Sequence, residues 1–192
     1  MSSLGDAAHV HADDRATWRA WLATNHETAS GAWLVTWRAP SGHAHLDYEA
    51  AVEEALCYGW VDSTAGRVDD DRSKLYFAPR KPRSAWSASN KARVARLIDE
   101  GRMAPAGLAV VAQAKATGDW EVLDSVERLE IPADLATALA AEPPAAANFA
   151  AFPASVRKQH LAWVATARRP ETRAERIARI SEAAARNERA RG

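Results

Sequence analysis

The chain has 192 residues, with 25 acidic and 25 basic side chains, one cysteine and eight tryptophans. That length allows one well-buried core, or a main domain with a helical appendage. A single cysteine excludes an internal disulfide, and no apolar run approaches the length of a membrane span. The N-terminus has neither the basic nor the apolar region of a signal peptide, so we expect a cytoplasmic protein without a membrane span.

The zero net charge conceals a strong segregation of charge along the chain. Residues 1–71 carry 12 acids and 4 bases, whereas residues 72–96 carry 8 bases and no acid. Residues 97–167 are acidic again, with 9 acids and 5 bases, and residues 168–192 are basic. A basic block of this kind either lies on a solvated face, or pairs with the protein's own acidic segment, or binds a ligand.

The N-terminal part of the chain predicts a helix followed by a strand. Asp13 or Asp14 is placed to cap the helix, in which Trp18 and Leu22 share one face at helical spacing. Residues 31–38, GAWLVTWR, are rich in aromatic and β-branched side chains and precede a turn-forming APSG segment, which is typical of a strand. Most of the tryptophans are expected to anchor the core.

A second helix is predicted from its N-cap Asp47 to its C-terminal glycine, Gly59. Cys57 lies beside the apolar stripe of this helix, so we interpret it as an inert core thiol and not as a nucleophile. The stripe that we expect to be buried consists of Tyr48, Ala51, Val52, Ala55 and Leu56.

Two further short strands are predicted at residues 60–65 and 74–78, on either side of the polar turn DDDRS. With residues 31–38 they would form one sheet. From Ser87 onward the pattern is helical to the end of the chain. The predicted fold class is therefore α+β, with a small antiparallel β-sheet packed with helices, followed by a mainly α-helical C-terminal region.

Two signals suggest how the helical region is organised. The Ala/Pro-rich segment 138–155 is the best candidate for a hinge, so we expect an α+β body at 1–142 and a C-terminal helical subdomain at 143–192. The T-x-x-E pattern of Thr172–Glu175 predicts a capping box at the start of the last helix.

Familiar catalytic and metal-binding motifs are missing. The chain contains no Gly-rich phosphate loop, no G-x-S-x-G elbow and no H-E-x-x-H. Two H-x-H pairs occur, His9/His11 in a terminus that we expect to be frayed and His43/His45 in a predicted turn. Neither pair has a third ligand nearby in sequence, so we predict no metal site and no cofactor.

Asp62 is the carboxylate that most needs an explanation. It follows Trp60-Val61 in a stretch that is expected to be largely buried, where a carboxylate requires a cation or several hydrogen bonds. The nearest cations, Arg80 and Arg83, lie one hairpin away, and they could either pin the loop through an ion pair or line a polar pocket. The pocket would collect Trp60, Asp62, Arg80, Arg83, Ser84, Trp86, Ser87 and Asn90.

The backbone of the segment PRKPRS favours a binding role. Pro79 and Pro82 are expected to hold it extended, with Arg80 and Arg83 three residues apart, close to a polyproline II repeat. The helix that follows Ser87 presents free N–H groups, which together with two guanidinium groups suit a carboxylate or phosphate.

Nucleic-acid binding is the second alternative. Tyr76, Phe77 and Trp86 alternate with cations in the basic block, which is typical of a surface on which bases stack. The overall pI near 7 and the absence of a nucleic-acid motif argue against this function.

Four segments together resemble the YdeI/OmpD-associated family, whose members are also called bacteriocin-protection proteins. They are EAAVEEALCYGWVDS (49–63), FAPRKPRSAWSASN (77–90), LIDEGRMAPAG (97–107) and WVATARRPETRAERI (163–177). The resemblance extends from about Trp18 to Ser181. It implies a role in bacterial stress and in resistance to cationic antimicrobial peptides, without implying a reaction, a cofactor or a catalytic residue.

The leading functional hypothesis is therefore a non-enzymatic protection protein that binds an unknown protein partner or a small anion at residues 80–90. The alternative is an enzyme of unknown reaction, with Asp62 as acid or base and with Arg80 and Arg83 as an anion clamp. The sequence does not predict the oligomeric state.

Overall fold

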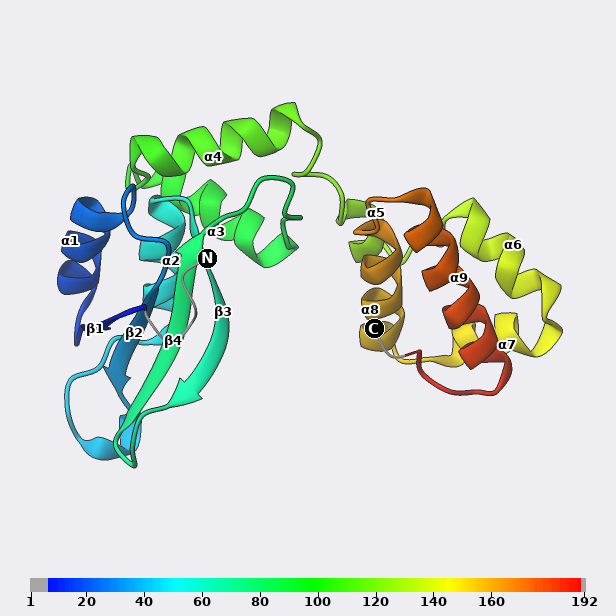
Figure 1. The fold of residues 1–192 in the computed structure, drawn as a ribbon, viewed down its shortest axis with the longest axis horizontal. Helices are drawn as coiled ribbons and strands as arrows, with labels where there is room; N and C mark the ends of the chain where they lie inside the picture. Colours follow the sequence, from blue (N-terminus) through cyan, green and yellow to red (C-terminus); the bar gives the residue numbers. More distant parts are fainter. Residues whose placement is uncertain (1–6, 191–192) are drawn as a thin grey trace. The chain divides into compact units, whose positions relative to one another are not determined.

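The computed structural model describes residues 7–190 and divides them into two compact units (Figure 1). The first unit comprises residues 7–84 and 89–117, and the second comprises residues 85–88 and 118–190. The division lies at residue 118 and not at the predicted boundary between 142 and 143. Its physical reason is that the helices on both sides of residue 142 share one apolar core, which is described below.

The first unit is built on a four-stranded sheet with the strand order β1-β2-β4-β3. β2 pairs with β4, and β4 pairs with β3, in antiparallel register as predicted, with an irregularity in β3 between Asp62 and Ala65. The elements of this unit are β1 (Ala8–His11), α1 (Arg15–Asn25), β2 (Ala32–Trp37), the short 3₁₀ helix η2 (Ala39–Ser41), α2 (Tyr48–Cys57), β3 (Trp60–Arg67), β4 (Arg72–Pro79), α3 (Ala88–Asp99) and α4 (Pro105–Ala116).

β1 was not predicted, and it makes the sheet mixed. It pairs with β2 in parallel register, from Ala8 opposite Ala32 to His11 opposite Val35. The expectation that His9 and His11 lie in a frayed terminus is therefore wrong. A four-residue edge strand is hard to recognise from sequence because only Val10 of β1 is buried.

α1 and α2 cover one face of the sheet through a tryptophan cluster. The ring of Trp18 lies 5.3 Å from that of Phe77 on β4 and 5.4 Å from that of Trp21. The Trp18 indole N–H donates to the carbonyl of Ala51 on α2 at 3.1 Å. Asp14 and Asp47 cap the two helices as predicted, with their carboxylates accepting from backbone N–H groups three residues on. Gly59 follows α2 with a φ of +75°.

α2 and α4 approach each other closely at Gly107. A Cβ atom at this position would lie 2.3 Å from the carbonyl oxygen of Cys57. The N–H of Ala104 also donates to that carbonyl, at 3.1 Å. The glycine is therefore required for this contact between helices, since any side chain would push α4 off α2.

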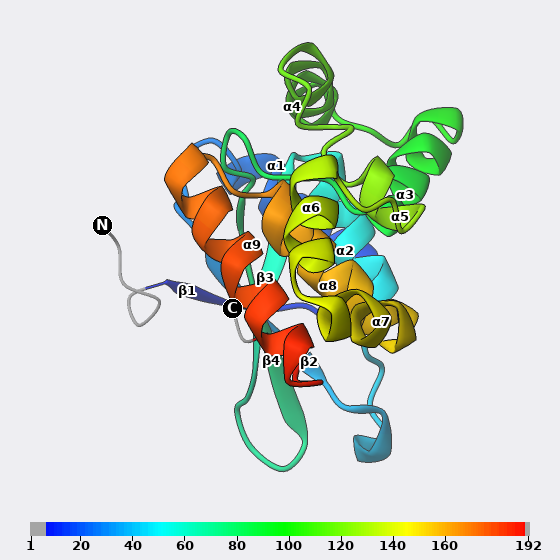
Figure 2. The same ribbon diagram turned by 90° about the vertical axis from the view of Figure 1, so that its right-hand side faces the viewer.

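The second unit is a helical bundle (Figures 1 and 2), which confirms the predicted helical C-terminal region. Buried Leu135, Phe149, Leu161 and Ile180 come from four different helices and share one core. The helices of this unit are α5 (Asp124–Glu127), α6 (Ala133–Ala141), α7 (Pro143–Ala151), α8 (Ala154–Ala165) and α9 (Pro170–Ala185).

The Ala/Pro-rich segment 138–155 is helical along most of its length and is not a hinge. Pro143 stands in the first turn of α7, where its fixed φ fits a helix and its missing N–H is not needed. α9 likewise begins at Pro170, and no side chain caps it. The predicted capping box at Thr172–Glu175 is therefore wrong, because the proline starts the helix two residues earlier.

Replacing Gly107 with alanine should destabilise the first unit by about 1–3 kcal/mol, because the new methyl group would overlap a backbone carbonyl that cannot move freely. Hydrogen exchange of the α2 amides would measure this loss. Gly66→Ala is the matched control, because its Cβ would meet only Lys74 carbons at 3.5 Å. A Gly107→Ala protein with the protection of the parent would contradict the close contact.

Candidate functional site

The predicted loop begins at the end of β4 and reverses direction at once. Arg80 donates its backbone N–H to the carbonyl of Gly59 at 2.9 Å. Pro82 and Arg83 then form a turn, which Ser84 closes by donating its hydroxyl to the carbonyl of Lys81 at 2.7 Å. Arg83 has a φ of +62°, the conformation of the third residue of a type II turn. The expected extended, polyproline-like course is therefore wrong.

Arg80 and Arg83 lie in different environments. The Arg80 side chain is partly buried, and burial lowers its pKa to about 10 although the charge of Asp62 acts in the opposite direction. Arg83 and Lys81 are exposed and form no ion pair within the described part of the chain. The two arginines that were expected to act together therefore differ in burial.

Asp62 makes its principal contact with a helix and not with an arginine. The hydroxyl of Tyr48, the first residue of α2, donates to Asp62 Oδ2 at 3.0 Å. Burial, reinforced by this hydrogen bond to a carboxylate, raises the pKa of the Tyr48 hydroxyl. Among residues 7–190, no ion pair joins Asp62 to Arg80 or Arg83, so that prediction is wrong. Tyr48 reaches Asp62 because α2 begins beside β3.

The other predicted site residues are distributed over both units. Trp60 is buried in the first unit and donates its indole N–H to the carbonyl of His26 at 3.3 Å. Asn90 on α3 accepts from Arg93 at 2.8 Å. Trp86 packs against Trp120 at 4.9 Å, and both belong to the second unit together with Ser87. The eight residues are therefore divided between the two units.

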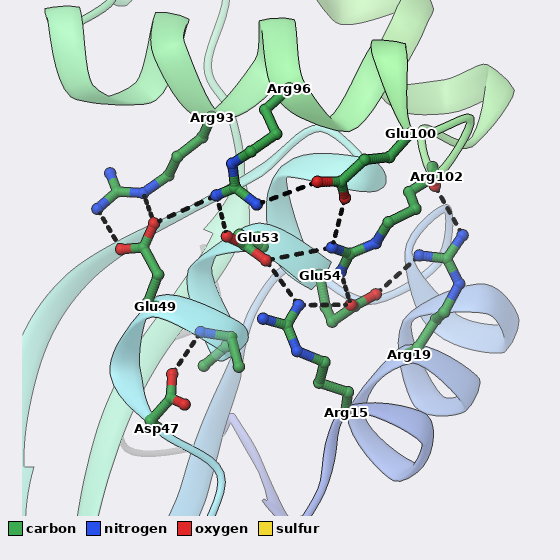
Figure 3. Close-up of polar contacts among 12 residues, drawn as sticks. Arg15, Arg19, Asp47, Glu49, Glu53, Glu54, Arg93, Arg96, Glu100 and Arg102 are labelled. Carbon is green, nitrogen blue, oxygen red and sulfur yellow. Dashed lines mark hydrogen bonds and ion pairs between the residues drawn. The ribbon is translucent and has the colours of Figure 1, made fainter.

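A cluster of ion pairs in the first unit was missed in the sequence analysis. Glu53 and Glu54 of α2 lie in the middle of a buried helix, and their side chains are only 2% and 3% exposed. Arginines from three other segments converge on them (Figure 3). They are Arg15 and Arg19 of α1, Arg96 of α3 and Arg102 of the segment before α4.

Each oxygen of the two carboxylates accepts a hydrogen bond. Arg15 binds Glu53 Oε2 at 2.6 Å and Glu54 Oε1 at 3.2 Å, and Arg102 binds the same two oxygens at 3.4 and 2.5 Å. Arg96 binds Glu53 Oε1, and Arg19 binds Glu54 Oε2 at 2.7 Å. With all four oxygens occupied, neither carboxylate is placed to act as a general base, and the cluster serves as scaffold.

A further ion pair extends the cluster along α2 and α3. Arg93 donates to both oxygens of Glu49, at 2.8 and 2.7 Å, in a bidentate arrangement. Arg96 also approaches Glu49 and Glu100, at 3.7 and 3.5 Å. A signal for this cluster was present in the sequence, because two glutamates inside an apolar helical run require cations if they are buried.

The basic block is therefore partly neutralised by the protein itself. Arg72 pairs with Asp69, and Arg93 and Arg96 pair with carboxylates of α2. The ammonium of Lys74 lies 4.4 Å from the ring centre of Trp33. Of the alternatives left open by the sequence, pairing with the acidic segment accounts for Arg72, Arg93 and Arg96, three of the eight cations of the block.

Two kinds of feature do not occur in the part of the chain that the structure describes. No group of three or more His, Cys, Asp or Glu residues is placed to hold a metal ion. No helix is both long and apolar enough to cross a membrane.

The cluster predicts how the stability of the first unit depends on pH. Burial disfavours the charged form of Glu53, but hydrogen bonds from Arg96 and Arg15 outweigh it and lower its pKa below 4.5. The hydrogen bonds from Arg93 lower the pKa of Glu49 in the same direction. Both groups therefore contribute stability that is complete above pH 4.5 and is lost as the pH falls through their folded-state pKa values.

Hydrogen exchange of the α2 amides, corrected for intrinsic rates, should show constant protection between neutral pH and about pH 5, and a steep loss below 4.5. Glu53→Gln is the control. It removes one titrating group, so the protection of the α2 amides should fall less steeply below pH 4.5 than in the parent protein. Protection that stays constant in strong acid, or that falls already near neutral pH, would show that the carboxylates do not hold the unit together.

Two family models match the chain. Residues 10–110, more than half of the chain, match a domain of unknown function (DUF8412). Residues 128–187 match the family described as bacteriocin-protection, YdeI or OmpD-associated (OmdA). No curated protein and no solved structure matches the chain.

The resemblance inferred from the sequence is thus confirmed for the C-terminal part only. Of the four segments that suggested it, 163–177 lies inside the second match, whereas 49–63, 77–90 and 97–107 lie inside the first. The chain therefore belongs to the DUF8412 family, and its second unit carries a segment of the YdeI/OmpD-associated family.

Proposed function

We propose that the protein is a non-enzymatic protection protein of the bacteriocin-protection type, which binds an anionic group of a partner through the turn Lys81–Arg83. The match of residues 128–187 to the YdeI/OmpD-associated model supports the protective role. The place of binding is supported by which cations of the basic block are paired with carboxylates and which are not.

The observation that carries the proposal is that Lys81 and Arg83 are exposed and form no ion pair among residues 7–190, whereas Arg72, Arg93 and Arg96 are paired with carboxylates. A cation without an internal partner is available to a ligand, and a paired one must first lose its partner.

The backbone of the turn favours a built site over a mobile basic arm. Pro82 fixes one φ angle, and Ser84 closes the turn with its hydroxyl. Arg83 adopts the left-handed conformation, which costs a non-glycine residue roughly 1 kcal/mol. Strain of this kind is concentrated at functional sites, and glycine would avoid it. The turn thus holds two cations in a fixed arrangement before the ligand arrives.

The two alternatives have less support. The enzyme hypothesis requires Asp62, Arg80 and Arg83 to converge, but Asp62 bonds with Tyr48 and Arg83 lies in an exposed turn. A nucleic-acid surface requires several free cations along a groove, and most cations of the basic block have internal partners.

Removing both charges tests the proposal. In the Lys81→Ala/Arg83→Ala protein, the affinity for inorganic phosphate, measured by NMR from the amide shifts of residues 80, 81, 83 and 84, should fall by about tenfold or more. A peptide-sensitive bacterial strain that produces this variant should lose the survival advantage that the parent protein gives against a cationic antimicrobial peptide.

The control is Arg38→Ala/Arg67→Ala, which removes two exposed cations near the other end of the β3–β4 hairpin, of which Arg67 is paired with Asp70. It should bind phosphate and protect cells as the parent does. Phosphate affinity that falls equally in both double variants would show a general charge effect. Full protection by the Lys81→Ala/Arg83→Ala variant would refute the role of the turn.

A further inference from the structure

A groove in the first unit lies apart from the turn and takes no part in the proposed function. It has a volume of about 400 Å³ and lies between the N-terminal end of α2 and the sheet. Leu34 of β2, Leu75 of β4 and Ala51 of α2 provide apolar walls, and Leu46, Asp47 and Tyr48 line its side at the start of α2.

The groove follows from the length of α2. Leu34 and Thr36 of β2 pair with Leu75 and Ser73 of β4, so these four side chains lie on the face of the sheet that α2 covers. Because α2 begins only at Tyr48, the part of this face nearest Thr36 and Ser73 has no helix above it. Apolar surface is therefore accessible beside a helix terminus.

Asp47 is the one carboxylate among the residues that line the groove, which also include Lys74 and His45. The ammonium of Lys74 lies over the ring of Trp33 at 4.4 Å, so this charge is engaged by an aromatic ring of β2, whereas the Asp47 carboxylate lies at the start of α2. Asp47 uses Oδ1 to accept from the N–H of Ala50 at 2.7 Å and forms no ion pair within the described residues. It differs in this respect from Glu53 and Glu54 of the same helix, which arginines surround.

The rim of the groove is held in place before any ligand binds. The side chain of Tyr48 is among the large exposed ones of the chain, with 55% of the residue accessible. Its hydroxyl nevertheless donates to Asp62 on β3, which ties the first turn of α2 to the neighbouring strand. An aromatic group that is exposed and yet fixed is suited to contact a ligand at little entropic cost.

We propose that this groove binds a small hydrophobic amine, with its apolar body on Leu34 and Leu75 and its ammonium group at Asp47. The volume lies at the lower end of the range of small-molecule sites, which favours a small ligand over a folded segment of a partner. The apolar walls make favourable contacts with an apolar body, and the Asp47 carboxylate interacts favourably with one positive charge.

The test uses phenethylamine, its neutral analogue phenethyl alcohol and the anion phenylacetate, with the full chain. Methyl resonances of Ala51, Leu34 and Leu75 report on the groove by NMR. We expect the methyl resonances of all three residues to shift with phenethylamine, about tenfold weaker binding of phenethyl alcohol and still weaker binding of phenylacetate.

Two variants separate the charge from the cavity. Asp47→Ser keeps a residue that caps helices and removes the charge, so the amine should bind about as weakly as the alcohol. Ala65→Trp, opposite Leu75 in the sheet, should fill the groove and abolish all binding, whereas Thr64→Trp on the same strand should not. Amide spectra of each variant confirm that it is folded.

The proposal is overturned if none of the three probes shifts these methyl groups at millimolar concentration, or if phenylacetate binds as well as phenethylamine. Binding that persists in a folded Ala65→Trp protein would place the amine elsewhere and would equally refute the site. These outcomes do not depend on Lys81 or Arg83, so they are distinct from a failure of the proposed function.

Discussion

The first unit depends on the burial of two adjacent carboxylates in the middle of α2. Buried unpaired carboxylates would cost several kcal/mol each, so Glu53 and Glu54 are compatible with folding only if cations surround them. The cations come from α1, from α3 and from the segment before α4. The requirement for neutralisation therefore links four parts of the chain.

This constraint also explains the charge pattern of the sequence. The basic block from 72 to 96 supplies Arg93 and Arg96 to the acidic helix that precedes it in the chain. Part of what first suggests an extended binding surface is thus an internal counter-charge. The cations that remain exposed and without an internal ion pair, Lys81 and Arg83, are grouped in one closed turn. A function based on positive charge is thereby confined to a small part of the block.

The fold was largely predictable because its strongest signals are local. Asp14 and Asp47 cap helices where the sequence placed them, and the antiparallel strands follow alternation and turn residues. Signals that depend on tertiary context were missed. β1 gains its order from pairing with β2, and the segment 138–155 becomes helical because a proline suits the first turn of α7.

The candidate site was less predictable because side-chain partners depend on geometry that one sequence does not contain. Asp62 was expected to meet an arginine because cations are abundant one hairpin away, but the start of α2 places Tyr48 closer. The same helix was expected to bury Tyr48, which is exposed, while its buried Glu53 and Glu54 were not recognised. A helical stripe assigned from apolar residues alone cannot account for a charged cluster that replaces part of the core.

The most direct test of the central claim is a double-mutant cycle on Arg15 and Arg102. Among the described residues, these two side chains donate hydrogen bonds to both Glu53 Oε2 and Glu54 Oε1. When one arginine is removed, the other therefore still binds both oxygens. The free energy of opening, measured by hydrogen exchange of the α2 amides, should fall by about 1 kcal/mol more in Arg15→Ala/Arg102→Ala than the sum of the single losses. Arg19→Ala/Arg96→Ala is the control, because these arginines serve different oxygens and their effects should add. Additive losses for Arg15 and Arg102 would contradict the account.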